Sequence, residues 1–342
     1  MKVSLLFPPS WHPSQPYLSL PCLTAFLDHA GITDKSQRDL NIEILDTILS
    51  KPYGLEIYQK LVDLAKHLEQ TMSGEEGPGS KEHYARVLES LDRFPYLIDQ
   101  IEPAKTSLRS EDFFDVDRYR ECLFLIDRWL DVVSSLYFPT RITVVDNQFA
   151  YSIYSSRDIM KAIRDEAQNP YIDLYKTYFL SSILDEAPGL IGVSITATSQ
   201  IIPGLTLCRL IKEANPDIHL TVGGSIFTRL VDNLRRCERL FEVTDDFIVF
   251  EGETAFLELI HQLEGKKDFK KVPNLIYKQD GKVTVNQPFY SENLAQHDAP
   301  NYDGFPLNQY LAPHTVLPVQ FSRGCYYKDC AFCALTLDHQ NF

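Results

Sequence analysis

Three cysteines near the end of the chain carry the strongest chemical signal in the sequence. Cys325, Cys330 and Cys333 lie within nine residues, with four residues between the first two and two between the last two. Thiolates are soft ligands that select iron–sulfur clusters or zinc, and three in one loop can converge on one metal centre. Structural zinc takes four ligands, and the candidates for the fourth are His339 and a residue of a partner. A cluster of four irons and four sulfides would instead keep one iron open.

The other four cysteines fit buried packing rather than metal chemistry. They are scattered among apolar positions of expected helices: Cys22, Cys122, Cys208 and Cys237. A free cysteine behaves as a small hydrophobic side chain and is usually buried. The odd total of seven cysteines also excludes a disulfide framework in which every cysteine is paired.

Glycine and small or acidic residues recur where predicted strands end. Short apolar runs predict strands of a parallel sheet, and ligands bind beyond the carboxyl ends of such strands. The residues at those ends are 8–11, 194–199, 223–225 and 251–253. Since glycine allows the main chain to approach a ligand closely, the pattern indicates either a ledge for a flat cofactor or ordinary turns between strands and helices. No glycine-rich dinucleotide or P-loop motif occurs.

The expected elements divide the chain into four parts. Strands at 3–7, 36–40, 141–145, 190–195, 218–222 and 246–250, with helices between them, predict an α/β sheet covered on both faces. Apolar residues spaced by three and four predict three amphipathic helices, which form a helical insertion. A hairpin with Asp280-Gly281 at its turn, a proline-rich linker and a short strand at 319–322 follow. The parts are 1–50 with 141–272 (α/β domain), 51–140 (helical insertion), 273–318 (hairpin and linker) and 319–342 (cysteine segment).

Composition limits the class of protein. The chain has 342 residues, 44% of them hydrophobic, and a formal net charge of −14, so it can bury a large core and is poorly suited to coating nucleic acid. No apolar run reaches the roughly 18 residues of a membrane span, and the first apolar run is broken by Pro8-Pro9. These features predict a cytoplasmic protein with small-molecule cofactors, without nucleic-acid or membrane partners.

Beyond these patterns, the chain resembles a known enzyme family. Arg323-Gly324 followed by the three cysteines and residues 334–339 resembles the cluster loop of radical S-adenosylmethionine (radical SAM) enzymes. Other segments are similar to the cobalamin (vitamin B12)-binding-domain subgroup of that superfamily: 7–11, 15–21, 38–41, 223–224, 251–253 and 302–306. The resemblance implies a Rossmann-like (flavodoxin-like) parallel sheet of the cobalamin-binding type, followed by the first strand and cluster loop of a radical SAM barrel.

The resemblance also implies cofactors and site residues. Cys325, Cys330 and Cys333 would hold a 4Fe-4S cluster whose open iron binds S-adenosylmethionine, and one electron would cleave a carbon–sulfur bond to give a 5′-deoxyadenosyl radical. Phe332 matches the position that packs near the adenine. Cobalamin would lie on the strand-end ledge and relay a methyl group, and the residues lining it would be Ser194, Thr196, Gly223, Gly224, Glu251 and Gly252.

Two features differ from the family's usual patterns. The superfamily commonly has three residues between its first two cysteines, whereas four separate Cys325 from Cys330, so the loop must bulge. The D-x-H-x-x-G signature, which supplies an axial histidine to cobalt in many cobalamin proteins, is absent because Asp28 and His29 are adjacent. Bound cobalamin is therefore expected without a protein histidine below its cobalt.

The short stretch of sequence after the cysteines bears on whether the chain includes a complete radical SAM barrel. A radical barrel needs roughly 200 residues, and nine residues follow Cys333. We therefore expect the N-terminal portion of a cobalamin-dependent radical SAM enzyme, incomplete as a catalyst alone, with a second chain as a candidate carrier of the remaining barrel. The alternatives are a non-catalytic cobalamin-binding protein and a zinc-binding interaction module that uses the three cysteines and His339.

Overall fold

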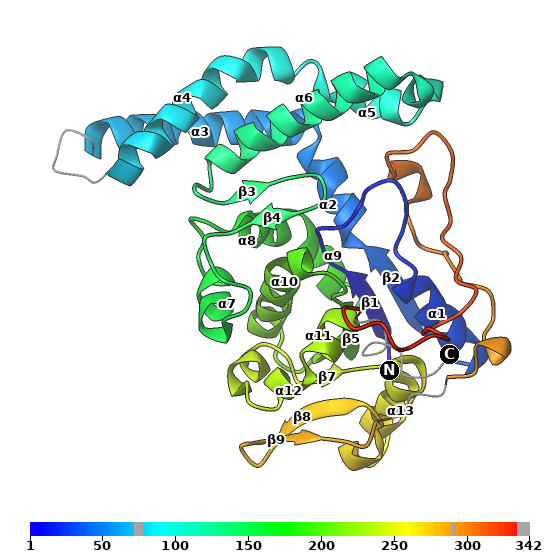
Figure 1. Cartoon of the computed structure of the whole chain (residues 1–342). Helices are drawn as coiled ribbons and strands as arrows, with labels where there is room; N and C mark the ends of the chain where they lie inside the picture. The colour runs from blue at the N-terminus through cyan, green and yellow to red at the C-terminus, as the bar shows by residue number, and fades with distance from the viewer. Residues whose placement is uncertain (72–77, 289–291, 334–342) are drawn as a thin grey trace.

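A computed structural model describes residues 1–71, 78–288 and 292–333. Its centre is a seven-stranded sheet in the order β2-β1-β5-β6-β7-β8-β9, in which the first five strands are parallel (Figure 1). The strands are β1 (Val3–Phe7), β2 (Lys35–Asp39), β5 (Leu190–Ser194), β6 (His219–Gly223), β7 (Asp246–Ile248), β8 (Leu275–Gln279) and β9 (Lys282–Val285). The chain adds β2 on one side of β1 and then adds β5 on the other side. The switch point of this doubly wound fold therefore lies between β1 and β5. The expected Rossmann-like α/β architecture is confirmed.

The inner parallel strands are rich in apolar residues because helices cover both faces of the sheet, whereas the edge strand β2 has a polar sequence. Every residue of β1 is buried, and β5 is buried from Leu190 to Val193. Two helices pack against each other on one side of the sheet, and a second group packs on the other (Figure 1). The first pair is α1 (Ser19–His29) and α13 (Glu253–Glu264), and the second group is α10 (Ile201–Ala214), α8 (Pro170–Leu174) and α9 (Leu180–Leu184). A π-helical turn, Tyr175–Phe179, lies between α8 and α9.

The hairpin belongs to the central sheet, although we expected it to lie with the linker outside the α/β domain. β8 pairs antiparallel with β7, and β9 pairs antiparallel with β8. The reason lies in the side chains of β8: Leu275, Ile276 and Tyr277 are buried, so this strand completes the core rather than standing alone.

Residues 141–145 do not form a strand of the central sheet, which corrects our expectation. Only β3 (Arg141–Ile142) is extended there, and it pairs antiparallel with β4 (Asn147–Gln148) in a separate small sheet. Side chains of the preceding helix hold this segment, because Arg141 Nε donates to Asp131 Oδ1 at 3.0 Å and the Ile142 amide donates to Ser134 Oγ at 2.9 Å. Residues 141–142 therefore bond to the end of the preceding helix and not to a neighbouring parallel strand.

A block of helices fills the long connection between β2 and β5 and lies at the top of Figure 1. The three expected helices are present, and two further helices, α2 and α5, were not anticipated. The helices are α2 (Leu40–Ile48), α3 (Lys51–Thr71), α4 (Pro78–Leu97), α5 (Ile101–Leu108) and α6 (Val116–Ser135). Trp129 of α6 is buried, and its indole Nε1 donates to the Ile48 carbonyl at 2.8 Å. At Gly54 an added Cβ would lie 2.2 Å from that indole, so α3 can approach Trp129 only because this residue is glycine.

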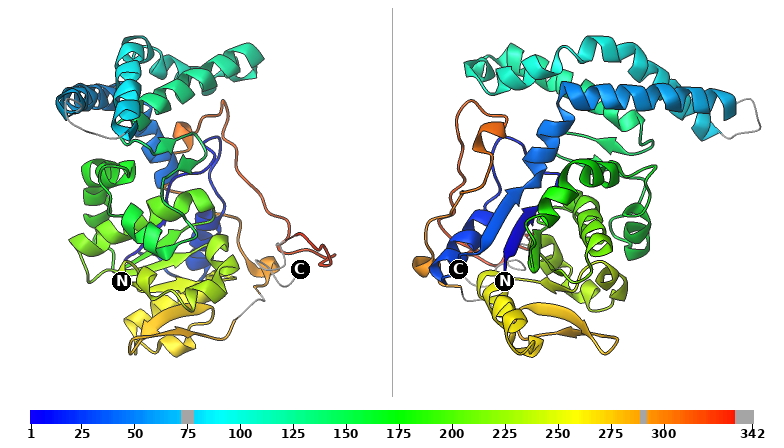
Figure 2. Two further views of the ribbon diagram at one scale, coloured as in Figure 1. Left: turned by 60° about the vertical axis from the view of Figure 1, so that its left-hand side comes forward. Right: turned by 180° about the vertical axis from the view of Figure 1, so that it is seen from behind.

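The expected linker packs along the edge of the sheet, and we call its residues 301–311 the strap. Gln37 of the edge strand β2 donates through Nε2 to the carbonyls of Asn301 and Asp303, both at 2.8 Å. The Tyr310 hydroxyl donates to Asp39 Oδ2 at 2.5 Å, and both groups are buried. Figure 2 shows this orange segment running beside β2 and α1. The strap has no strand partners, so it is attached to the sheet by the Gln37 side chain, which bonds to the strap main chain, and by its own Tyr310 side chain.

Residues 319–322 form no strand, in contrast to the barrel strand that we expected there. Phe321 is 96% exposed, and no described strand lies beside this segment to bond with its backbone. An isolated extended run leaves its N–H and C=O groups to water and is not a stable strand. In the described parts of the chain, no helix is both long and apolar enough to cross a bilayer.

A histidine–aspartate pair at the amino end of β6 and β7 predicts pH-dependent stability. His219 Nε2 lies 2.6 Å from Asp246 Oδ2, and the other oxygen of this buried carboxylate has no hydrogen-bond partner among the described residues. Burial lowers the pKa of His219, but Asp246 and Asp245 outweigh it, so the pKa is raised above 6.5. The stabilisation is therefore complete below pH 6.5 and is lost as pH rises through the folded-state pKa.

We expect His219→Asn to lower the free energy of unfolding by about 1–3 kcal/mol at pH 6 and by less at pH 9. Urea unfolding followed by circular dichroism at several pH values measures this difference. The matched control is His29→Gln, because the His29 side chain is 66% exposed. A His219 variant whose stability falls equally at both pH values would contradict a protonation-linked pair.

Candidate ligand site at the carboxyl ends of the strands

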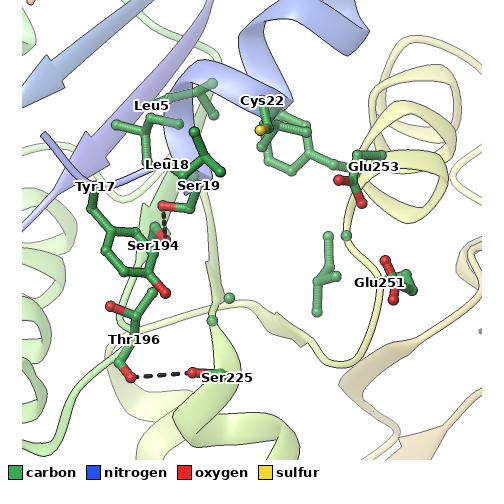
Figure 3. Close-up of a pocket in the computed structure, with 18 of the residues that line it drawn as sticks. Leu5, Tyr17, Leu18, Ser19, Cys22, Ser194, Thr196, Ser225, Glu251 and Glu253 are labelled. Atoms are coloured by element: carbon green, nitrogen blue, oxygen red, sulfur yellow. Dashed lines mark hydrogen bonds between the residues drawn. The ribbon is translucent and has the colours of Figure 1, made fainter. Parts of the chain in front are cut away.

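A cavity of about 250 Å³ opens at the carboxyl ends of β5, β6 and β7 (Figure 3). Its walls come from these strand ends, from the start of α1, and from Gln320 and Arg323 of the cysteine segment. The structure brings together all six ledge residues named from the sequence: Ser194, Thr196, Gly223, Gly224, Glu251 and Gly252. A concave, largely apolar site with a few polar groups at a switch point is typical of a small-molecule pocket.

Parallel pairing aligns the strand ends that form the ledge. Ser194 lies opposite Gly223, and Gly223 lies opposite Ile248 in the register of the sheet. The Ser194 hydroxyl donates to Ser19 Oγ at 2.9 Å, which ties the end of β5 to the start of α1 (Figure 3). The ledge is therefore assembled by three adjacent strands and fastened to the helix that faces it.

A buried glutamine fixes the loop after β5. Gln200 Oε1 accepts hydrogen bonds from the Thr196 amide at 2.9 Å and from the Thr196 hydroxyl at 3.0 Å. Its Nε2 donates to the Pro8 carbonyl at 2.6 Å, so the same side chain also holds the loop after β1. Ser225 Oγ donates to the Thr196 carbonyl at 3.2 Å. Thr196 is thus held in place before any ligand arrives.

Gly224 gives the ledge its flat surface. Its φ of +118° is a conformation that side-chain-bearing residues rarely adopt, and an added Cβ would lie 2.0 Å from the Ile195 carbonyl oxygen. The neighbouring Gly223 has no side chain either, so bare main chain faces the cavity. A flat cofactor can rest on such a surface, and in this respect the residues present fit cobalamin.

Glu251 and Glu253 follow β7 and bind the guanidinium of Arg323, which the sequence analysis did not place at the pocket. Arg323 Nη1 lies 2.5 Å from Glu251 Oε2, and Arg323 Nη2 bonds to Glu253 Oε1. The three side chains are only 13%, 6% and 8% exposed. Burial lowers the pKa of Arg323, but Glu253 and Glu251 raise it above its ordinary value. The guanidinium therefore stays charged and compensates two buried carboxylates. No local pattern could show this contact, because at least 70 residues separate the partners.

Residues around the start of α1 also line the pocket and were not among the expected site residues, and three of them carry a hydroxyl or a thiol. They are Tyr17, Ser19 and Cys22. Cys22 was interpreted as a packing residue, and burial raises the pKa of its thiol to about 11. The thiol is therefore neutral near pH 7 and contributes a small apolar surface to the wall. Only the placement of α1 against the strand ends shows this role.

The three cysteines named as metal ligands lie outside the pocket. Cys325 is half-buried, whereas Cys330 and Cys333 are exposed. Backbone N–H groups of Lys328 and Tyr327 lower the pKa of Cys325 below its usual value. Within the described residues, no three metal-binding side chains are close enough to share an ion. His339 and residues 334–342 lie outside the described residues. The three thiols suit a cluster by their chemistry, but their side chains are not gathered around one point.

Phe332 is not part of the ledge. Its side chain is 95% exposed, and it does not line the cavity. The structure therefore separates the expected site residues into two groups: six that surround the pocket, and a loop with three cysteines and Phe332. Arg323, two residues before Cys325, is the point at which the second group touches the first.

Comparisons with known proteins bear on the α/β part of the chain. Residues 153–260 match the family described as the B12 binding domain. Over 153 residues the chain is 29% identical to a protein of Pyrococcus horikoshii named as an uncharacterized methyltransferase. This match covers 44% of the chain and 32% of the relative, so the chain spans about a third of that protein's length. The comparisons thus support a B12-binding domain at residues 153–260, within a mixed α/β unit whose sheet is mostly parallel.

Proposed function

We propose that this chain is the N-terminal portion of a cobalamin-dependent radical SAM enzyme. The observation that carries the proposal is the pocket at the switch point of a B12-binding domain, with Arg323 of the cysteine segment forming part of its wall. Further protein, in the same or a second chain, would supply the rest of the radical barrel. Methyl transfer is the reaction class we favour, and the name of the Pyrococcus relative agrees with it.

In this proposal the pocket residues hold cobalamin. The main chain of Gly223, Gly224 and Gly252 would support the flat ring. The hydroxyls of Ser194 and Thr196 already donate to Ser19 and Gln200, so their oxygens would accept hydrogen bonds from the cofactor. Cobalamin, when bound, supplies a carrier for a methyl group. No histidine is among the described residues that line the pocket.

The cysteine loop would hold the second cofactor. Cys325, Cys330 and Cys333 provide three thiolates for a 4Fe-4S cluster, which suits a soft ligand set. The cluster supplies an open iron for S-adenosylmethionine and the electron for radical formation. Because the thiols are exposed or half-buried, the loop can close around a cluster without displacing packed core residues.

Two experiments on the full chain test the proposal. Hydroxocobalamin is mixed with the protein and separated by gel filtration, and we expect about one corrin retained per chain with a spectrum lacking a histidine ligand. Anaerobic reconstitution with iron and sulfide should give the brown absorbance of an iron–sulfur cluster, and Cys330→Ser should abolish it. The matched control is Cys237→Ser, which removes a thiol outside the loop.

Each experiment has an outcome that contradicts its part of the proposal. Absence of retained corrin at stoichiometric loading would remove the cobalamin site. A colourless protein that instead binds one zinc per chain would replace the cluster with a zinc site. Retained corrin together with a loop that binds no metal would leave a cobalamin-binding protein without radical chemistry.

A further inference from the structure

The cysteine segment is almost free of packing against the α/β domain. Every described residue from 314 to 333 is exposed except Pro318 and residues 323–325. The side chains of Phe321 and Tyr326, on either side of that short stretch, are 96% and 81% exposed. A segment with so little buried surface depends on a few specific contacts for its position.

Contacts at His314, Pro318 and Arg323 join this segment to the rest of the protein, and the first of them is an exposed approach of His314 Nε2 to Glu111 Oε1 at 3.4 Å. The Tyr302 hydroxyl donates to the Pro318 carbonyl at 2.9 Å, and Arg323 reaches Glu251 and Glu253. We call the group of Arg323, Glu251 and Glu253 the Arg323 clasp. A guanidinium that bridges two buried carboxylates is a strong, directional contact, because its planar donors match both acceptors.

The two carboxylates stand on a rigid support. Asn274 is buried, and its Nδ2 donates to the Glu251 carbonyl at 2.7 Å. Glu253 is the first residue of α13, and the following amide, that of Thr254, donates to Glu292 Oε1 at 2.9 Å. The acidic side of the clasp is therefore fixed to the sheet and to a helix, so the mobile partner is the segment that carries Arg323.

We propose that Arg323 is a positioning residue that fastens the cysteine segment to the ligand pocket and couples the order of that segment to pocket occupancy. The coupling part rests on the proposed function, whereas the fastening part does not. Arg323 and Gln320 form one wall of the same cavity that Glu251 and Gly252 line. A ligand on the ledge would therefore contact Arg323 and Gln320 or restrict their movement. Because Cys325 lies two residues after Arg323, this restriction extends to the cysteine segment.

Two buried ion pairs stabilise the Arg323 clasp. Without Arg323, the carboxylates of Glu251 and Glu253, which are 6% and 8% exposed, would lose the guanidinium that bonds to both of them. Leaving a buried charge without its partner is strongly unfavourable. The clasp should therefore stay closed in the free protein.

Limited chymotrypsin digestion of the full chain, mapped by mass spectrometry, tests the fastening. We expect Arg323→Gln to speed cleavage after Phe321 and Tyr326 by about tenfold or more, because a protease cuts a segment that can leave the surface. The triple variant Arg323→Gln, Glu251→Gln, Glu253→Gln should show the same increase. It removes all three charges together, so it leaves no repelling carboxylates that could unfold the domain. Circular dichroism verifies that both variants keep the fold.

The matched control is Lys328→Gln, which removes one positive charge from the same exposed segment. Its digestion rate should equal that of the unaltered protein. If the triple variant is also digested at the unaltered rate, Arg323 does not fasten the segment, and the proposal is wrong whether or not the chain binds a corrin.

Adding hydroxocobalamin tests the coupling. We expect saturating corrin to slow cleavage after Phe321 and Tyr326 by about threefold or more in the unaltered protein and to have no effect in Arg323→Gln. If corrin is retained but digestion of the unaltered protein does not change, the coupling is wrong while the cobalamin site stands. If no corrin is retained, the proposed function fails, and the ligand-free digestion still decides the fastening.

Discussion

Gly224→Ala is expected to lower hydroxocobalamin affinity by more than about tenfold and to destabilise the fold by about 2–4 kcal/mol. The added methyl would lie 2.0 Å from the Ile195 carbonyl oxygen, at a φ of +118° that alanine rarely adopts. Relief of this overlap requires the main chain of residues 223–225 to move, and this main chain is the ledge itself. Corrin retention and urea unfolding measure the two effects separately.

Gly281→Ala is the matched control for this substitution. Gly281 also has a positive φ, +77°, but no atom lies within 4 Å of an added Cβ. We expect a stability loss of about 1 kcal/mol from backbone strain alone and unchanged corrin affinity. If Gly224→Ala retained corrin as the unaltered protein does, the main chain at Gly224 would not be the binding surface.

Asp39→Asn is expected to remove a large pH dependence of stability. Burial raises the pKa of Asp39 to about 7, although hydrogen bonds from Tyr310 and from the amides of Ile42 and Asn41 oppose the rise. In the unfolded chain the carboxyl ionises near pH 3.8. Between these values the folded state holds a proton that the unfolded state has lost, so stability falls as pH rises from about 4 to about 7. This loss of stability amounts to about 4 kcal/mol.

The asparagine variant cannot ionise, yet its amide can still bond with Tyr310 and with the first amides of α2. We therefore expect the variant to gain stability relative to the unaltered protein as pH rises from 4 to 7, and to differ by a constant amount above pH 8. Urea unfolding across this range measures the difference. Asp232→Asn is the control, since its side chain is 81% exposed, and its profile should run parallel to that of the unaltered protein. A parallel profile for Asp39→Asn would show that the Asp39 proton is not linked to folding.

The parallel sheet and the ledge were predictable because their signals are local. Most of the central strands lie in short apolar runs, and Gly223, the last residue of β6, is followed directly by Gly224. Parallel strands bring their carboxyl ends to the same edge, so residues far apart in sequence meet there without further information. The positions of Ser194, Glu251 and Gly252 follow from the same rule.

Contacts that depend on distant partners were not predictable. The pairing of Arg323 with Glu251 spans 72 residues and leaves no periodic trace. Residues 141–145 looked like a strand, but Arg141 bonds to the preceding helix, and only two residues are extended. Helix α2 was missed because it follows β2 without a loop, and Asp39 both ends the strand and caps the helix.

The strap affects whether the β2 edge of the sheet can pair with a strand of another chain. An uncovered outer strand presents a row of free N–H and C=O groups that can template pairing with another chain. Here Gln37 binds two strap carbonyls, and an added Cβ at Gly304 would lie 3.2 Å from the Gln37 carbonyl oxygen, so strap backbone lies directly over the strand. The segment that leads toward the cysteines thereby also shields the sheet from edge-to-edge polymerisation.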